Sequence, residues 1–535
     1  MPLITLFVIS LLTRFVFLFF GFPSLTHDEA DYFLNSYLLT KTGSDIFSNK
    51  FFLTSGILNA TSAIPVYLGS ISYYFLEKSV ISGRLPYAIF NSLIPVLFYF
   101  ILFKLTKNKT FSLIGFTVLN FSPWFSYLSA MSSIDAPTAL VFYLLAVIVL
   151  LAEFRPIAKY SLFTLSMFFS FNSYMGFKTI AFFLIFIALL LKDIFYREKI
   201  TAKKVVRNVT ISLVMFLFFF TLSWISPAGS YFKNRLKAKI LPLNTVEISK
   251  SVNSLREMSK GPTILRYFIH NKLTYLGGQF IDKYIQAYNP TTIFVKGDTH
   301  PLYGTGFIGL FYFFDLVFIL VGFYFASHVF KDNYKIVIPF FLIILVTPIA
   351  LGAMADSSTL SLRGLPLILG YSFFISTGVY FLANYLSKNK KIIILIVFLI
   401  YLSSFIYFLA LYKTTIRYMS GEQWHMNEKR LLDKVLSEKK FKNRQIYIYV
   451  NDPKETMLLY LFYKEKSASK IKSVIGSGKF EVGNITFSDL CPDEKILGSV
   501  QIMNSERCPI NLKVFTYSDF ITPEISKGSK YLLLQ

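Results

Sequence analysis

Two adjacent carboxylates directly after the first hydrophobic segment are the residues best suited to chemistry. Asp28 and Glu29 follow His27 in the run HDEADY. A carboxylate at the end of a hydrophobic helix, where water thins out, can acquire a raised pKa and act as general base toward a hydroxyl. The alternative is structural: Asp28 caps the helix that follows, while Glu29 and Asp31 favour its N-terminal dipole. The spacing is compatible with either interpretation.

Three cations that are far apart in the sequence each stand at the start of a hydrophobic segment. They are Arg84, Lys178 and Arg363, and Tyr174 belongs to the same stretch as Lys178. Cations at one membrane face can converge on a phosphate, with Arg binding as a fork and Lys as a point charge. We therefore assign these four residues to substrate binding. Each cation alone is also typical of a side chain that snorkels to the membrane surface.

Two further residues are candidates for substrate binding. Trp124 lies in a Ser-Pro-Trp turn between two hydrophobic segments, and Asp298 lies two residues before His300. The alternatives are an aromatic membrane-belt residue and ordinary loop polarity. A pair of ligands is too few to indicate a metal, so no metal site is predicted. The sequence has only two cysteines, Cys491 and Cys508, which are too few for a cysteine-rich metal site. An oxidising location would allow them to form a disulfide.

The composition indicates which kind of element must position these residues. Of the 535 residues 54% are hydrophobic and only 16% are charged, whereas a soluble domain carries roughly 25% charged residues. The net charge is +24, and beside this much apolar sequence it indicates a membrane partner rather than nucleic acid. Disorder is excluded by the same numbers. The sequence predicts a polytopic α-helical membrane protein.

A spanning helix needs about 20 mostly apolar residues. About eleven segments qualify, namely 3–22, 84–103, 110–128, 134–152, 160–174, 177–191, 209–226, 306–327, 335–352, 364–386 and 391–412. Alternate loops between them are rich in Lys and Arg, which is typical of cytoplasmic loops. We therefore expect a multi-pass protein of the plasma membrane with a cytoplasmic N-terminus and with the candidate site outside.

Two domains are expected. Residues 1–412 form the membrane domain, with external loops at 23–83 and 227–305, and residues 413–535 form a small α/β cap domain outside the membrane. Loop 23–83 suggests helices lying along the membrane interface, and loop 227–305 is basic, with 11 Lys and Arg against 4 Asp and Glu. In the cap domain, alternation predicts a strand at 444–450, a helix at 456–463, and β-like runs at 474–480 and 512–515.

Taken in order, these motifs resemble the membrane glycosyltransferases of the GT-C fold. The resemblance is to family 39 and to the protein-mannosyltransferase-like group that includes aminoarabinose and lipopolysaccharide-sugar transferases. It covers residues 1–385 and rests on Arg14, the run Asp28-Glu29-Ala30, Thr42-Gly43-Ser44-Asp45, Arg84-Leu85-Pro86, Ser122-Pro123-Trp124, Phe294 to Asp298 before a glycine-led span (Gly304 to Gly309), and Arg363 with Pro366. Two positions depart from the pattern, since Ala130 and Lys178 stand where an Arg is expected.

The resemblance implies a reaction and its partners. Asp28 becomes the catalytic base. Glu29, the second catalytic residue, is its neighbour or a contact to donor or acceptor, and Arg84 and Lys178 are phosphate contacts. The donor is a polyprenyl-phosphate sugar, which serves as co-substrate; it carries no nucleotide, in agreement with the missing nucleotide-binding motifs. No other cofactor is implied; a divalent metal is compatible with the sequence but is not indicated by it. An acceptor hydroxyl attacks the anomeric carbon, and the phosphate leaves already charged, so it needs cations rather than a proton donor.

Three other functions compete with single-sugar transfer. A lipid-linked sugar flippase or other transporter would show internal repeats and polar residues at mid-membrane, and we find neither in the sequence. An oligosaccharyltransferase or ligase of the same fold is implied by resemblance to depend on a metal and more external acids. The third is a catalytically inactive scaffold that has lost its active site. It is suggested by Ala130, which stands after Ser129 where the family pattern has an Arg. The sugar and the hydroxyl acceptor, whether protein, lipid-linked glycan or polymer, are left open.

Overall fold

The protein is described by a computed structural model. It describes residues 3–21, 24–56, 61–129, 135–226, 229, 232–234, 236, 246–353, 360–386, 390–441, 443–491, 496–508, 517–521 and 530–534. Ala130, one of the two departures from the family pattern, lies outside these residues.

The chain forms two compact units, which are described separately. The first unit comprises Met1–Thr13, Asn91–Leu128 and Asp135–Phe405. The second comprises Arg14–Phe90, Ser129–Ile134 and Ile406–Gln535. Helices α1 (Leu3–Phe20) and α21 (Lys390–Leu411) therefore each contribute residues to both units.

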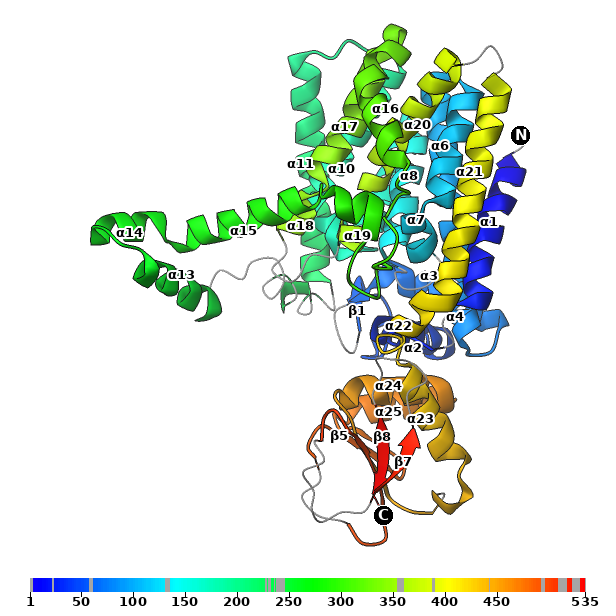
Figure 1. The fold of residues 1–535 in the computed structure, drawn as a ribbon, viewed down its shortest axis with the longest axis vertical. Helices are drawn as coiled ribbons and strands as arrows, with labels where there is room; N and C mark the ends of the chain where they lie inside the picture. Colours follow the sequence, from blue (N-terminus) through cyan, green and yellow to red (C-terminus); the bar gives the residue numbers. More distant parts are fainter. Residues whose placement is uncertain are drawn as a thin grey trace. The chain divides into compact units, whose positions relative to one another are not determined.

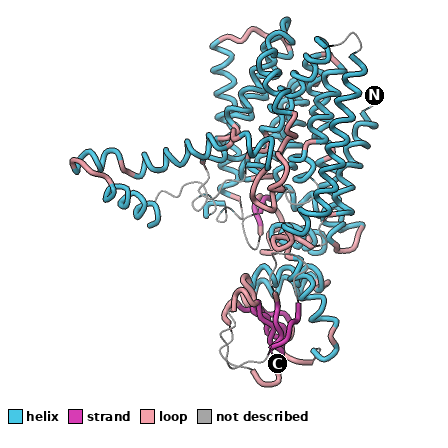
Figure 2. The backbone as a smooth tube through the Cα atoms, in the orientation of Figure 1, coloured by secondary structure: helices cyan, strands magenta, loops and turns pink. Residues whose placement is uncertain are grey.

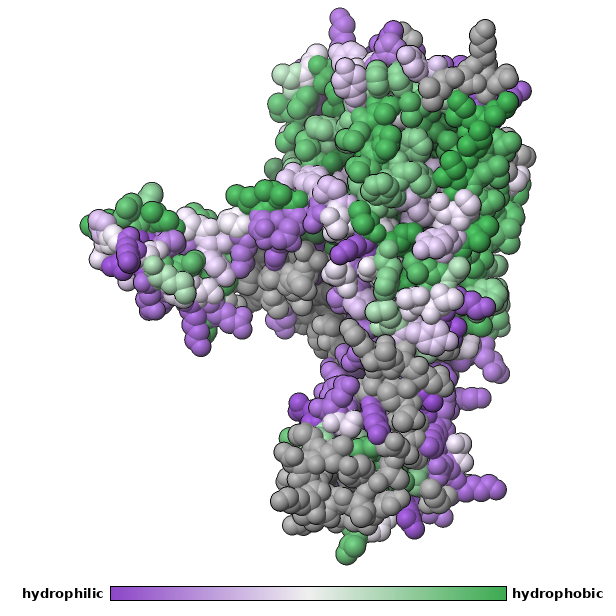
Figure 3. All heavy atoms as spheres, in the orientation of Figure 1, coloured by the Kyte–Doolittle hydropathy of each residue, from purple (hydrophilic) through white to green (hydrophobic). Residues whose placement is uncertain are grey.

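The first unit is a helical bundle (Figure 1). Its helices are α5 (Leu93–Thr106), α6 (Lys109–Phe121), α7 (Pro123–Tyr127), α8 (Asp135–Leu151), α9 (Pro156–Phe171), α10 (Met175–Phe195), α11 (Ala202–Ile225), α13 (Val246–Met258), α14 (Thr263–Ile269), α15 (Lys272–Gln286), α16 (Asp315–Val329), α17 (Val337–Val346), α18 (Ile349–Gly352), α19 (Leu360–Arg363) and α20 (Leu367–Leu386). Figure 3 shows hydrophobic side chains covering the visible flank of this bundle. Leu320, Phe323 and Tyr324 of α16 are exposed large apolar side chains, and such a surface suits lipid better than water.

Seven helices among the described residues are long and apolar enough to cross a membrane. They are Leu3–Phe20, Val80–Thr106, Met175–Phe195, Ala202–Ile225, Asn333–Gly352, Leu367–Tyr385 and Lys390–Met419, and each coincides with a predicted span. The other four predicted spans correspond to shorter helices: α6 with α7, α8, α9 and α16. The chain is thus a multi-pass membrane protein, with seven of the roughly eleven predicted spans at full length.

The predicted span at 306–327 begins too early. Helix α16 starts only at Asp315. Gly306 adopts φ +68°, and a Cβ on Gly304 would lie 2.1 Å from the carbonyl oxygen of Asp298. The glycine-led stretch therefore turns back tightly against the preceding segment, because only a residue without a side chain allows this approach.

Helices α13, α14 and α15 form an arm of the first unit (Figure 1). They occupy part of the loop predicted at 227–305, and no residue of α14 or α15 is buried. The large apolar side chains of Ile264, Phe268 and Leu273 are exposed, beside basic residues such as Arg266 and Lys272. This composition is typical of helices at a membrane surface.

The second unit combines short N-terminal helices with a sheet from the C-terminal part of the chain (Figure 2). Its helices are α2 (His27–Thr42), α3 (Ala63–Phe75), α4 (Val80–Asn91), α22 (Arg417–Met419), α23 (Met426–Ser437), α24 (Pro453–Lys464) and α25 (Ala468–Gly476). Its strands are β1 (Thr54–Ser55), β2 (Thr61–Ser62), β3 (Ile446–Tyr449), β4 (Glu481–Val482), β5 (Ile485–Ser488), β6 (Val500–Asn504), β7 (Tyr517–Ile521) and β8 (Tyr531–Leu534).

Strands β3 to β8 form one mixed sheet in the order β4-β5-β3-β6-β8-β7. The central strand β3 pairs in parallel with both β5 and β6, with Ile448 opposite Phe487 and Ile502. The other described pairings in this sheet are antiparallel. A strand that is buried on both faces is typical of the centre of an α/β sheet.

A single hydrophobic core joins α2 and α3 to the C-terminal sheet and its helices. Eleven of the sixteen residues of α2 are buried. The ring of Phe33 lies 6.0 Å from that of Phe462 in α24, and the Tyr37 hydroxyl donates to the carbonyl of Lys466 (2.6 Å). Helix α2 is therefore packed inside the second unit, covered by α24 and α3, and its position along the membrane interface stays a prediction.

The predicted strand at 444–450 and helix at 456–463 are confirmed as β3 and α24. The β-like run at 474–480 is wrong at its start, since Val474 belongs to α25. There the Ser467 side chain accepts from Lys470 N–H as an N-cap, and Ile471 is buried, so local capping and one buried contact favour the helix. The run at 512–515 lies outside the described residues.

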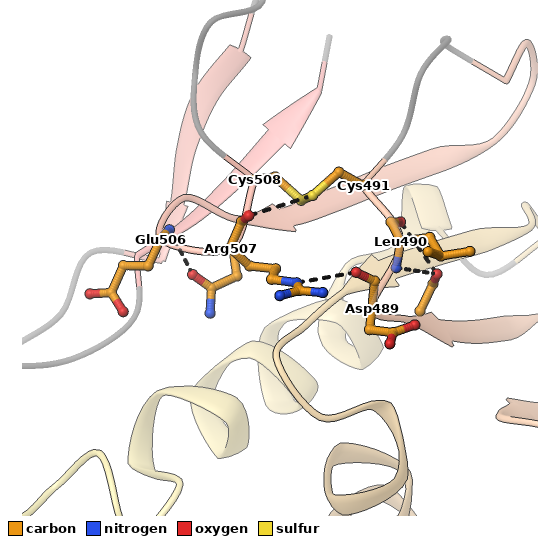
Figure 4. Close-up of a disulfide and its surroundings, with 8 residues drawn as sticks. Asp489, Leu490, Cys491, Glu506, Arg507 and Cys508 are labelled. Atoms are coloured by element: carbon orange, nitrogen blue, oxygen red, sulfur yellow. Dashed lines mark hydrogen bonds between the residues drawn. A yellow bond between two sulfur atoms is a disulfide. The ribbon is translucent and has the colours of Figure 1, made fainter. Parts of the chain in front are cut away.

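Cys491 and Cys508 form a disulfide, with Cα atoms 5.6 Å apart (Figure 4). It joins the end of the β5 strand region to the segment after β6, and Arg507 Nε donates nearby to the Asp489 carbonyl (3.2 Å).

Replacing both cysteines by serine is expected to lower the free energy of unfolding of the second unit by about 3 kcal/mol. The bond closes a loop of 17 residues, and a loop of this length restricts the unfolded chain by about that amount. Hydrogen–deuterium exchange at β5 and β6 of the detergent-solubilised protein measures the change. Dithiothreitol should reproduce it in the wild type and should not affect the double variant. Equal exchange in all samples would show that the disulfide does not contribute.

Candidate functional site

The N-terminus of α2 is closed by a capping box. Thr26 is the N-cap, and its hydroxyl accepts from Glu29 N–H while Thr26 N–H donates to Glu29 Oε2, both at 3.1 Å. This arrangement satisfies two backbone donors that the helix end leaves open. The structural interpretation in which Asp28 caps the helix is therefore wrong, because Thr26 and Glu29 share that role.

Glu29 also forms a buried ion pair with Arg84 of α4. Arg84 donates from Nε to Oε1 (2.7 Å) and from Nη2 to Oε2 (2.8 Å), and Nη2 also donates to the carbonyl of Ser24 (2.8 Å). Both side chains are 1% exposed. The guanidinium carbon lies 5.2 Å from the ring centroid of Trp424. Burial raises the pKa of the Glu29 carboxyl, and the charge of Arg84 opposes that rise.

Asp28 has a different environment from its neighbour. Its side chain is 38% exposed, and its Oδ1 lies 3.5 Å from Nε2 of His27. The capping box and the Arg84 ion pair both use Glu29. Of the two carboxylates, Asp28 is therefore the one that can meet a substrate in solution, while Glu29 holds the helix and Arg84.

His27 also faces a second cluster of ionisable residues within this unit. Glu455, in the first turn of α24, places Oε1 3.9 Å from His27 Nδ1 and Oε2 3.8 Å from His425 Nε2. These atoms all lie within 4.8 Å of one another, an arrangement that could hold a metal ion. Burial lowers the pKa of His425 to about 4, so its imidazole is neutral at neutral pH. Burial raises the pKa of Glu455, and the two histidines oppose that rise.

In the first unit, Trp124 and Asp298 are joined through Ser361 of α19. Trp124 Nε1 donates to the Ser361 carbonyl (2.7 Å). Asp298 Oδ2 accepts from Ser361 Oγ (2.8 Å) and N–H (3.2 Å), and its Oδ1 accepts from His300 N–H (3.0 Å). The Trp124 side chain is buried, with its ring 5.9 Å from that of Phe311 in an edge-on contact. Trp124 and Asp298 thus anchor the segment around α19.

A polar cavity of about 170 Å³ adjoins Asp298. Asn289, Thr292 and Thr299 contribute polar side chains to its lining, and Leu360 of α19 closes one wall. A cavity of this size holds only a small group or several water molecules.

The remaining predicted residues of the first unit are also buried. Lys178 places Nζ 4.6 Å from the centroid of the Phe232 ring, and its side chain is 6% exposed. Tyr174 precedes α10, and its ring fits beside Gly176, where a Cβ would lie 2.4 Å from the ring. Arg363 ends α19 and is 8% exposed.

The predicted site residues therefore fall into two groups. Asp28, Glu29 and Arg84 belong to the second unit, whereas Lys178, Tyr174, Trp124, Asp298 and Arg363 belong to the first. Residues that the sequence interpretation missed are Ser361 in the first unit and Trp424, His425, Glu428 and Glu455 in the second. The pair Trp424-His425, two uncommon residue types soon after the last hydrophobic segment, was a usable signal.

Replacing Asp298 by Asn is expected to lower the stability of the α19 segment by about 2 kcal/mol. The carboxylate accepts three hydrogen bonds in a buried position, and a bond to a charged acceptor contributes about 1.5–3 kcal/mol. Faster hydrogen–deuterium exchange at Leu360–Arg363 is the expected readout. Asp282→Asn, on exposed α15, is the matched control and should leave that exchange unchanged.

Comparison with solved structures finds similarities at low sequence identity. The chain is similar to the archaeal oligosaccharyltransferase AglB from Archaeoglobus fulgidus, solved with an inhibitory peptide and a dolichol-phosphate, at 12% identity and a TM-score of 0.43, covering 94% of this chain and 69% of that chain. It is also similar to ArnT from Cupriavidus metallidurans bound to undecaprenyl phosphate, at 11% identity and a TM-score of 0.40, covering 99% and 97%. No family model matches the sequence, and no curated protein matches it.

Proposed function

We propose that the chain is an integral-membrane glycosyltransferase that moves a single sugar from a polyprenyl-phosphate carrier to a hydroxyl acceptor. The reaction takes place on the outer face of the membrane. Asp28 is the general base. The substrate contacts assigned from the sequence stay predictions, and Arg84 supports the catalytic helix through Glu29.

The different environments of Asp28 and Glu29 carry this proposal. Glu29 is 1% exposed and is committed to the N-cap and to Arg84. Asp28 lies beside it on the first turn of the same capped helix, and its side chain is 38% exposed. A carboxylate that is presented to solvent by a well-anchored helix can be within reach of a substrate hydroxyl without rearrangement of the fold.

The chemistry requires one base and a set of cations. Asp28 removes the proton of the acceptor hydroxyl as its oxygen attacks the anomeric carbon, and the bond from that carbon to the phosphate oxygen breaks. The carrier leaves as a phosphate that is already charged, so positive side chains stabilise it and no proton donor is needed. A positioned general base contributes about 10²–10⁴-fold to such a step.

Transfer of radiolabel in membranes tests the proposal. Membranes with and without the protein receive a polyprenyl-phosphate hexose labelled in the sugar, and the label is followed in protein, lipid and polymer fractions. Label that moves from the carrier to an acceptor only where the protein is present supports the proposal. Labelled carrier that crosses the bilayer with its sugar still attached would contradict it and would indicate a transporter. The absence of both transfer and crossing, with each acceptor class supplied, would also contradict it.

A further inference from the structure

We propose that His27, His425 and Glu455 bind one divalent transition-metal ion of the Zn²⁺ type. The three side chains come from the first residue of α2, the residue before α23 and the first turn of α24. All three belong to the second unit. The proposal does not depend on the glycosyltransferase reaction, because the ligands, their geometry and the metal can be examined without it.

The distances fit an ion better than direct hydrogen bonds. Both imidazole nitrogens that face Glu455 lie 3.8–3.9 Å from its carboxylate oxygens, which is too long for a hydrogen bond. Zinc binds His nitrogen at about 2.0–2.1 Å and carboxylate oxygen at about 2.0–2.2 Å, so two such ligands on a tetrahedral ion lie about 3.4 Å apart. The two imidazole–carboxylate distances exceed this value by about 0.5 Å. The ligand atoms of the three residues all lie within 4.8 Å of one another, so closing around an ion would shorten the widest pair by up to about 1.4 Å.

The far nitrogen of each imidazole also faces a carboxylate. Asp28 Oδ1 lies 3.5 Å from His27 Nε2, and Glu428 Oε2 lies 3.8 Å from His425 Nδ1. The other oxygen of Glu428 accepts from the Tyr531 hydroxyl (3.0 Å), which orients the carboxylate. Histidines that bind metals commonly donate their second N–H to a carboxylate, and this partner sets both tautomer and ring orientation. Both distances are longer than an ordinary hydrogen bond, so the two carboxylates stand where such a second layer would form once an ion is bound.

The set of ligands also specifies the class of ion. Two imidazoles and one carboxylate with a free fourth position for water are typical of zinc and of similar first-row ions, whereas calcium and magnesium prefer oxygen ligands alone. The three ligand side chains are only 15–29% exposed. This partial exposure lets an ion enter from solvent while the protein excludes most of the surrounding water.

The ion would fasten the start of α2 to α24. These two helices already pack through Phe33 and Phe462, but that contact lies about two helical turns from the N-terminus of α2. A metal bridge between His27 and Glu455 would hold the first turn itself, where Asp28 and Glu29 lie. Its expected role is therefore to position α2, and binding should stabilise the second unit.

Metal content and thermal stability of the full-length protein test the proposal. The protein is purified in detergent with a tag that contains no histidine, stripped with a chelator, and titrated with Zn²⁺ alone. One equivalent of tightly bound zinc per chain and a raised melting temperature are expected. His27→Gln, His425→Gln and Glu455→Gln should each lower zinc affinity more than a hundredfold, and Glu428→Gln about 10–100-fold. His270→Gln, on the exposed arm, should retain wild-type affinity.

Two results would overturn the proposal. The first is a stripped wild type that takes up no tightly bound zinc and shows no change in melting temperature. The second is a folded His27→Gln/His425→Gln variant that still binds zinc as the wild type does. If these variants do not fold, the visible absorption spectrum of Co²⁺ bound to the wild-type protein tests the proposal. Visible d–d bands of a tetrahedral nitrogen and oxygen site support the proposal, and an octahedral spectrum contradicts it.

Discussion

Asp28→Asn is expected to lower sugar transfer at least a hundredfold without loss of folded protein. The amide cannot accept the hydroxyl proton, and loss of a positioned general base costs about 10²–10⁴-fold. The fold should tolerate the change because the side chain is 38% exposed and Thr26 and Glu29 form the capping box. The initial rate of label transfer from the polyprenyl-phosphate hexose, per folded chain, is the quantity to compare.

Two variants make this result specific to the carboxylate at position 28. Asp28→Glu keeps the base but displaces it by one methylene, so partial activity is expected. Glu77→Gln removes an exposed carboxylate from the same unit and should transfer sugar at the wild-type rate. If Asp28→Asn retained the wild-type rate, the base would have to be another residue. If the Glu77→Gln variant were equally inactive, a general loss of negative charge would explain the effect.

Breaking the Glu29–Arg84 pair is expected to destabilise the protein severely. Both charges are buried and joined by two short hydrogen bonds. Removal of one partner leaves an uncompensated buried charge, which costs about 3–5 kcal/mol. Glu29→Gln and Arg84→Met should therefore each lower the melting temperature of the detergent-solubilised protein and increase hydrogen–deuterium exchange at His27–Thr42.

The double variant Glu29→Gln/Arg84→Met separates the ion pair from its two members. With both charges removed, no buried charge is left unpaired, so we expect the double variant to be more stable than Arg84→Met alone. Additive losses in the double variant, or single variants as stable as the wild type, would contradict a coupled structural pair. A folded Arg84→Met variant with normal stability but reduced affinity for the phosphate carrier would instead support phosphate binding by Arg84.

Together, the Asp28 and Glu29–Arg84 experiments distinguish a residue that takes part in catalysis from residues that stabilise the fold. Asp28 variants should change the rate and leave the melting temperature unchanged, whereas Glu29 and Arg84 variants should change the melting temperature first. The motif Asp28-Glu29 indicated an important position but could not divide these roles, because the two residue types have the same charge and are adjacent in the sequence.

Sequence patterns were sufficient to predict the membrane class, the seven spans that are full-length helices, and the local elements β3 and α24. These features depend on the length of apolar runs, on charge between them and on periodicity, all of which act within a few residues. Where capping and glycine geometry prevailed over hydropathy, as at α25 and before α16, the predicted bounds were wrong.

Which charged groups meet depends on the folding of distant segments onto one another. Arg84 reaches Glu29 across 55 positions, and His27 faces His425 and Glu455, which come from the C-terminal part of the chain. Hydrophobic packing of α2 against α24 brings these residues together. This packing cannot be predicted from composition or from the spacing of residues in the sequence. A buried charge must nevertheless be paired, and for this reason the partner chosen by the fold determines whether a conspicuous residue is available for chemistry.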